Sequence, residues 1–205
     1  AISDDEVVRE AACQEIIRRY YKAACDYKQG KGTKAARHKI EMIMQQLNLS
    51  PEDRPCVLPA RKRREEVGAA AAAIQLASGE IVTGRASNLM SASSAAILNA
   101  IKAMAGIDRE ALLIQPEVLE PILKLKINIL GSRSSVLKVD DVLAALSITP
   151  TRNPPAALAM EQLPNLRDLD MHSSQMLHNG DEGTLRKLGL RLTCDPEYPS
   201  KDLYF

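Results

Sequence analysis

The sequence has few aromatic residues and almost no net charge. Its 205 residues include one Phe, five Tyr and no Trp, and its 27 Lys and Arg residues are balanced by 26 Asp and Glu, a formal net charge of +1. Proteins that bind single strands stack bases on aromatic side chains, and nucleic-acid binders in general present a basic surface. The composition therefore argues against a nucleic-acid partner.

Long apolar runs are also absent. No stretch approaches the roughly 20 consecutive apolar residues of a membrane span, and the first residues do not have the pattern of a signal peptide. We therefore expect no membrane partner and a cytoplasmic location. The chain begins at Ala1 rather than at Met, which suggests a fragment of a longer protein.

The four cysteines, Cys13, Cys25, Cys56 and Cys194, do not form closely spaced pairs. A structural zinc site usually takes its ligands from two such pairs. The sequence therefore predicts no metal site, and no motif in it indicates a cofactor. Two disulfides are possible by number, but nothing indicates secretion, and a chain of this length does not need them. We expect reduced, mostly packed thiols.

Two amphipathic helices are predicted within residues 1–55. Their apolar stripes consist of Val8, Ala12, Ile16, Tyr20, Ala24 and Tyr27 in the first helix, and of Ala36, Ile40, Ile43, Met44 and Leu47 in the second. Gly30 and Gly32 lie between them, so the pattern indicates a helical hairpin. These stripes must be buried against the rest of the chain, a missing N-terminal region or a second copy. We expect a homo-oligomer.

Residues 56–68 have the character of a connector. Pro55 and Pro59 flank its start, and a basic run at residues 61–64 is followed by Glu65 and Glu66. A basic run can bind phosphate. Two glutamates directly behind this one favour an ordinary solvated face.

Residues 69–205 alternate between strand and helix patterns. Two short apolar runs around Gly79 predict a β-hairpin, and Ser91 is a good N-cap for a helix that ends at Gly106. Further helices are expected after Pro116, Asp140 and Pro154, and later strands near residues 170–176 and 190–194. The predicted fold class is α/β, with a helical hairpin followed by a three-layer α/β/α domain on a mixed sheet.

Several stretches together resemble one family. They are residues 79–84, 130–148 and 161–167, and the closing residues 181–182, 186–189 and 192–196 agree with them. The chain resembles the C-terminal part of the bacterial family called domain of unknown function 1846. The resemblance covers nearly the whole chain. It implies a longer cytosolic protein with no assigned reaction, and an N-terminal region of the same protein as a partner.

The order of elements also resembles the cytidine-deaminase-like sandwich. Zinc deaminases begin the helix after the hairpin with a His or Cys ligand and a nearby Glu, and a Pro-Cys-x-x-Cys pair follows. The corresponding residues 91–96 here are Ser and Ala only, and no Cys-x-x-Cys occurs. The resemblance therefore implies the architecture without the zinc ligands or the deaminase chemistry.

Asp170 and His172 are the candidate catalytic residues. Residues two apart on a strand face the same way, and a carboxylate beside an imidazole can make it a general base. With His178 and the acidic residues 181 and 182 close behind, the group could instead bind a metal. The simpler alternative is a helix start and an ordinary strand edge.

Two segments are candidate anion-binding sites. The first is the helix start at Ser91, Ser93 and Ser94, which Arg85 precedes; the second is the turn with Ser132 and Arg133. Helix N-termini and hydroxyl groups suit phosphate. Either segment could equally be an ordinary cap or surface loop.

The leading interpretation is a structural and oligomerisation region that contributes to a small-molecule pocket. The alternative is an enzyme acting on a phosphorylated or nucleotide-like small molecule, with a site near His172 and the helix start at Ser91.

Overall fold

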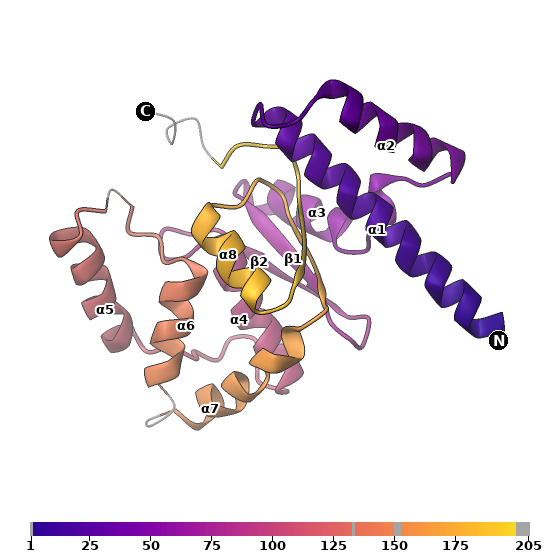
Figure 1. The fold of residues 1–205 in the computed structure, drawn as a ribbon. Coiled ribbons are helices and arrows are strands. Elements are labelled where there is room, and N and C mark those ends of the chain that lie inside the picture. The colour runs from indigo at the N-terminus through magenta and orange to yellow at the C-terminus, as the bar shows by residue number, and fades with distance from the viewer. Residues whose placement is uncertain (1, 133, 150–152, 200–205) are drawn as a thin grey trace.

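The computed structural model describes residues 2–132, 134–149 and 153–199 (Figure 1). The helices are α1 (Ile2–Lys28), α2 (Lys34–Gln46), α3 (Val57–Val67), α4 (Ala92–Met104), α5 (Pro116–Lys124), α6 (Val139–Ile148), α7 (Pro154–Glu161) and α8 (Asn179–Lys187). The strands are β1 (Ala71–Gln75), β2 (Ile81–Arg85), β3 (Asp170–Ser173) and β4 (Arg191–Cys194). A π-helical turn, Leu125–Ile129, extends α5, and 3-10 turns occur at Pro51–Asp53 and Leu163–Leu166.

The four strands form one mixed sheet in the order β2-β1-β3-β4. Strand β1 is antiparallel to both of its neighbours, whereas β3 and β4 run parallel. This confirms the predicted α/β class with a mixed sheet. The parallel pair needs a crossover, which α8 supplies between β3 and β4.

Helices cover both faces of this sheet. Ala72 and Ile74 of β1 pack in one core with Ile97 and the rest of the buried face of α4. Ala73, on the opposite face of β1, packs against Cys56 and α3. Figure 1 shows α1 and α2 on one side of the sheet and α4 to α8 on the other. Three layers result, because alternate residues of a central strand point to opposite faces.

Helix α4 crosses strand β2 at Gly84 with almost no space between the two backbones. A Cβ built on Gly84 would lie 2.1 Å from the amide nitrogen of Ala96 and 2.6 Å from the carbonyl carbon of Ala95. The run of Ser and Ala at the start of α4 permits this approach, since larger side chains would hold the helix away.

The segment expected to be a connector folds as α3 and packs against the sheet. Pro59 is the third residue of this helix, a position whose N–H has no partner within the helix, so a proline is tolerated there. The basic run is not simply solvated. Arg61 binds Asp195 and Glu52, and Arg64 donates to the Ser174 carbonyl oxygen at 2.6 Å.

The two N-terminal helices are present, and Ala24 of the expected stripe in α1 is buried, but the most buried face also includes the neighbouring positions. Ile17, Tyr21 and Cys25 are buried, whereas Val8 and Tyr27 are 66% and 44% exposed. The reason is that α1 packs against the sheet as well as against α2. In α2, Met44 is buried while Ile43 and Leu47 are exposed.

Within the described residues, no helix has the length and apolar character that crossing a membrane requires.

We predict that Gly84→Ala destabilises the fold by about 3 kcal/mol, because the added methyl group meets backbone atoms of α4 that cannot rotate away. Gly183→Ala is the control. Gly183 lies in the interior of α8, and its added Cβ meets nothing within 4 Å. Gly183→Ala should therefore stabilise the fold by about 0.5–1 kcal/mol. Urea denaturation measures both; equal effects at the two glycines would contradict the close approach.

Candidate functional site

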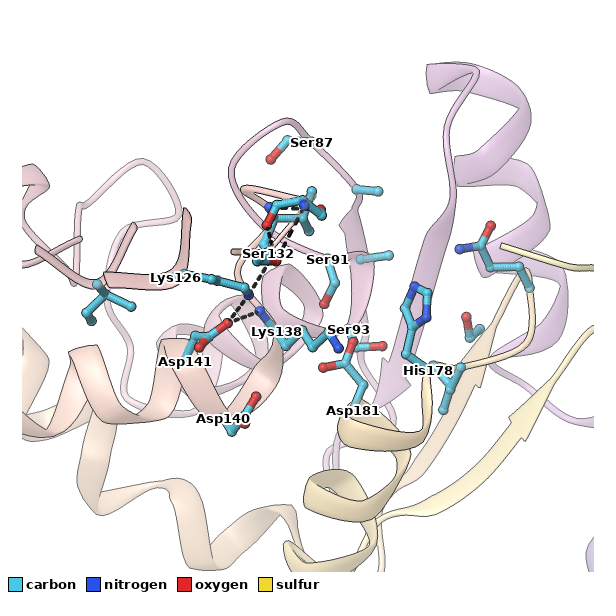
Figure 2. Close-up of a pocket in the computed structure, with 18 of the residues that line it drawn as sticks. Ser87, Ser91, Ser93, Lys126, Ser132, Lys138, Asp140, Asp141, His178 and Asp181 are labelled. Carbon is cyan, nitrogen blue, oxygen red and sulfur yellow. Dashed lines mark hydrogen bonds and ion pairs between the residues drawn. The ribbon is translucent and has the colours of Figure 1, made fainter. Parts of the chain in front are cut away.

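A cavity of about 570 Å³ lies where the starts of three helices meet (Figure 2). It is walled by the loop before α4, the segment from α5 to α6, and the segment that joins β3 to α8. Its polar lining includes Ser91, Ser93, Lys126, Ser132, Lys138 and His178. A volume of this size is typical of small-molecule sites.

The residues that precede α4, α6 and α8 all line this cavity. They are Ser91, Lys138 and His178. The first N–H groups of a helix lack intrahelical partners, and the N-terminal end carries a partial positive charge. Three such ends around one space make it favourable for an anion.

Ser93 is a largely buried residue in the first turn of α4. The residue is 2% exposed and lines the cavity, and no hydrogen bond to its hydroxyl occurs within the described residues. The hydroxyl of Ser91, by contrast, has a partner, because its Oγ accepts from the Ser94 amide at 3.2 Å. The Ser93 hydroxyl is not among the fully buried atoms that lack a partner, so it remains accessible from the cavity and can bind a ligand atom.

Two lysines and three carboxylates also line the cavity. Lys126 pairs with Asp141 at 2.5 Å, and the Asp181 carboxylate accepts from the amide of Val139 at 2.8 Å. Asp140 is exposed. The charges of Asp141 and Asp181 are thus already engaged by a lysine and a helix end.

Lys138 forms no ion pair or side-chain hydrogen bond with any residue that the structure describes. A Cβ on Gly180, in the first turn of α8, would lie 3.9 Å from its Nζ. An ammonium at the positive end of a helix is unfavourable unless an anion lies nearby. Figure 2 places Ser91, Ser93 and Lys138 between Asp141 and His178.

The structure brings some residues of both predicted anion-binding segments to the same cavity. Ser91, Ser93 and Ser132 line the same cavity. Ser94 is buried outside it, where its Oγ contacts the Ser91 Oγ at 2.8 Å. Arg85 is exposed and does not line the cavity. Arg133 lies outside the described residues. Sequence reasoning missed Lys126 and Lys138, because neither lies in a recognisable motif.

His172 lies on the other face of the sheet and does not line this cavity. It is fully buried beneath Tyr21, whose ring centroid is 4.9 Å from that of the imidazole. Its Nδ1 is 2.9 Å from the Thr193 Oγ1, and its Nε2 is 3.5 Å from the Asp195 Oδ2.

Asp195 rather than Asp170 is the carboxylate that faces His172. Asp170 pairs with the buried Arg54 at 3.1 Å, and Arg54 also donates to the Arg191 carbonyl oxygen. Strand alternation therefore does not place Asp170 in contact with His172, since each side chain has its own partner. These contacts do not test a catalytic role, and that role stays a prediction.

Burial lowers the pKa of His172, so the imidazole is neutral at neutral pH. Burial opposes ionisation of Asp195 as well, but the neighbouring His172 and the hydrogen bonds from Arg61 outweigh it and lower its pKa to about 2. Arg61 donates to the Asp195 Oδ1 at 2.7 Å. We assign the imidazole proton to Nε2, because that nitrogen faces the charged carboxylate.

No group of three or more His, Cys, Asp or Glu side chains in the described ranges is arranged to hold a metal ion.

Comparison with known proteins identifies one family. The profile described as "Domain of unknown function DUF1846, C-terminal" matches residues 52–204, and its N-terminal counterpart matches residues 1–48. UPF0371 proteins of Clostridioides difficile and Clostridium tetani are 48% and 46% identical to the chain over all of its length. One from Streptococcus thermophilus is 48% identical. The chain spans 41–42% of the length of these relatives.

The burial of neutral His172 predicts a pH dependence of stability. Between its lowered folded pKa and the unfolded value near 6.5, the unfolded chain binds a proton that the folded chain does not, so acidification destabilises the fold. This group should cost at most about 1 kcal/mol between pH 6.5 and 5.5. Denaturation at both pH values should show that His172→Gln removes this loss.

The control is His38→Gln, because the side chain of His38 is 68% exposed. This variant should keep the full pH dependence of the wild-type chain. If His172→Gln retained it too, the assignment of a neutral buried imidazole would be wrong.

Proposed function

The chain belongs to the DUF1846 family, and from the cavity within its C-terminal part we propose that this part binds a phosphorylated small molecule. The observation that carries the proposal is the unpartnered hydroxyl of Ser93 beside three helix starts. In this proposal a phosphate oxygen accepts from that hydroxyl and from the free amides at the start of α4, and the ammonium of Lys138 balances the charge.

The rest of the cavity suits the remainder of such a molecule. Ile122, Leu125 and Leu177 provide apolar walls. Asp140 offers carboxylate oxygens that can accept from hydroxyl or amino groups of a ligand. A sugar phosphate or a nucleotide combines these features. The proposal includes an enzymatic role only as an alternative, since the cavity does not contain His172.

We expect phosphate to stabilise the folded chain. A ligand that binds only the folded state at ten times its Kd stabilises it by about 1.4 kcal/mol, which raises the Tm by about 3–5 °C for a chain of this size. Differential scanning fluorimetry with inorganic phosphate, against sodium chloride of equal ionic strength, measures the shift. Lys138→Met and Ser93→Ala should each reduce it by more than half.

Lys124→Met is the matched control. It removes the same charge from α5, where Lys124 pairs with Glu120 outside the cavity lining. This variant should keep the full phosphate effect. A shift no larger than that with sodium chloride, or one equally weakened by Lys124→Met, would rule the site out.

We also propose self-association, as a second role. Leu125 and Ile129 on the π-helical turn beside the cavity, and Leu130 directly after it, are 51%, 75% and 71% exposed. Apolar side chains grouped in this way are typical of interaction surfaces. A second copy of the chain is the proposed occupant, and the N-terminal region of the longer relatives is the competing one.

Light scattering tests the second role. The self-associating chain should give a mass well above 22.4 kDa, and Ile129→Asp should return it to the mass of a monomer. Val7→Asp, at another exposed apolar residue, is the control and should leave the mass unchanged. A monomeric wild-type chain would contradict the proposal.

Two finer assignments belong to this proposal. The cytidine-deaminase-like arrangement is supported by the β1–β2 hairpin followed by α4 with its capped start of small residues. A cytoplasmic location is supported by the four free thiols.

A further inference from the structure

Two cysteines far apart in the sequence meet between α1 and the sheet. The sulfur atoms of Cys25 on α1 and Cys194 at the end of β4 are 3.6 Å apart, across a sequence separation of 169 residues. The Cys25 thiol also lies 3.4 Å from the carbonyl oxygen of Cys194, to which it can donate. A disulfide requires a sulfur separation of about 2.05 Å, so the two sulfur atoms must approach by about 1.5 Å more to form one.

The other two cysteines provide a contrast. Cys56 is fully buried and donates to the carbonyl oxygen of Asp170 at 3.3 Å. Cys13 is partly exposed. Neither lies within hydrogen-bond distance of another thiol in the described part of the chain. Of these four thiols, Cys25 and Cys194 alone are placed to react with each other.

Both cysteines line a small cavity of about 110 Å³. Its lining includes Gln29 and Met176, which are joined by a hydrogen bond from the Gln29 amide to the Met176 sulfur. One water occupies about 30 Å³ of liquid volume, so a space of this size accepts a molecule of a few heavy atoms. Hydrogen peroxide fits this limit, whereas a peptide disulfide does not.

We propose that Cys25 and Cys194 form a redox-active pair that hydrogen peroxide oxidises to a disulfide. The Cys194 thiolate attacks one peroxide oxygen and becomes a sulfenic acid as the O–O bond breaks and hydroxide leaves. The Cys25 sulfur, losing its proton, then attacks the Cys194 sulfur, which forms the S–S bond and releases water. In total, two thiols lose two electrons and two protons, and one peroxide becomes two waters.

Accessibility assigns Cys194 as the attacking group, because Cys194 is partly exposed whereas Cys25 is buried. The hydrogen bond with Cys25 lowers the pKa of Cys194, and the backbone of Leu177 adds to this effect. The same hydrogen bond, together with burial, raises the pKa of Cys25. A thiolate is therefore favoured at Cys194, and Cys25 serves as the resolving thiol.

The test is to oxidise the full folded chain with a small excess of hydrogen peroxide, block the remaining thiols with N-ethylmaleimide and map the peptides by mass spectrometry. The expected result is a Cys25–Cys194 cross-link, with Cys13 and Cys56 still alkylated. Loss of the Cys194 thiol should be at least tenfold faster than loss of the Cys56 thiol. No cross-link in the wild-type chain, or one that appears only in urea, would overturn the proposal.

Two variants separate the steps. Cys25→Ser removes the resolving thiol, so Cys194 should accumulate as a sulfenic acid that dimedone traps. Cys13→Ser is the control and should leave the cross-link unchanged. Dimedone labelling of Cys13 before Cys194 would also overturn the proposal. The wild-type peptide map decides the question even where a variant does not fold.

Discussion

The close contact between α4 and β2 at Gly84 determines where the start of α4 lies. Because the helix backbone rests directly on the strand, this contact sets how close the start of α4, with Ser91 and Ser93, lies to the sheet. Helix α6 packs on α4, and α8 packs on α6, so the other two helix starts are positioned from this contact. The cavity between them depends on one residue without a side chain.

Local signals predicted much of this arrangement. The turn at Gly79 predicted the hairpin, Ser91 the start of α4, and Pro116, Asp140 and Pro154 the later helices. Each of these is a property of a few adjacent residues, which a sequence displays directly. The same reasoning selected Ser91, Ser93 and Ser132 as anion-binding candidates, and the structure brings all three to one cavity.

The sequence could not predict contacts between distant segments. The partner of His172 is Asp195, from beyond the next strand, and Lys138 reaches the start of α8 only after both helices have packed. Helix α3 was not predicted within the connector, because its prolines lie before it and in its first turn, where they do not interrupt it. The alternation of side chains along β3 correctly predicts which face of the sheet each side chain lies on. It does not predict which residue each side chain contacts.

Asp181 links the stability of two helices. Its carboxylate lies in the first turn of α8, where it complements that helix, and it also accepts the first amide of α6. The start of α6 therefore lacks this acceptor whenever α8 is detached. Residues 139–148 and 179–187 should therefore open together, as a single unit of local unfolding, and their amide protons should exchange with solvent at matching rates.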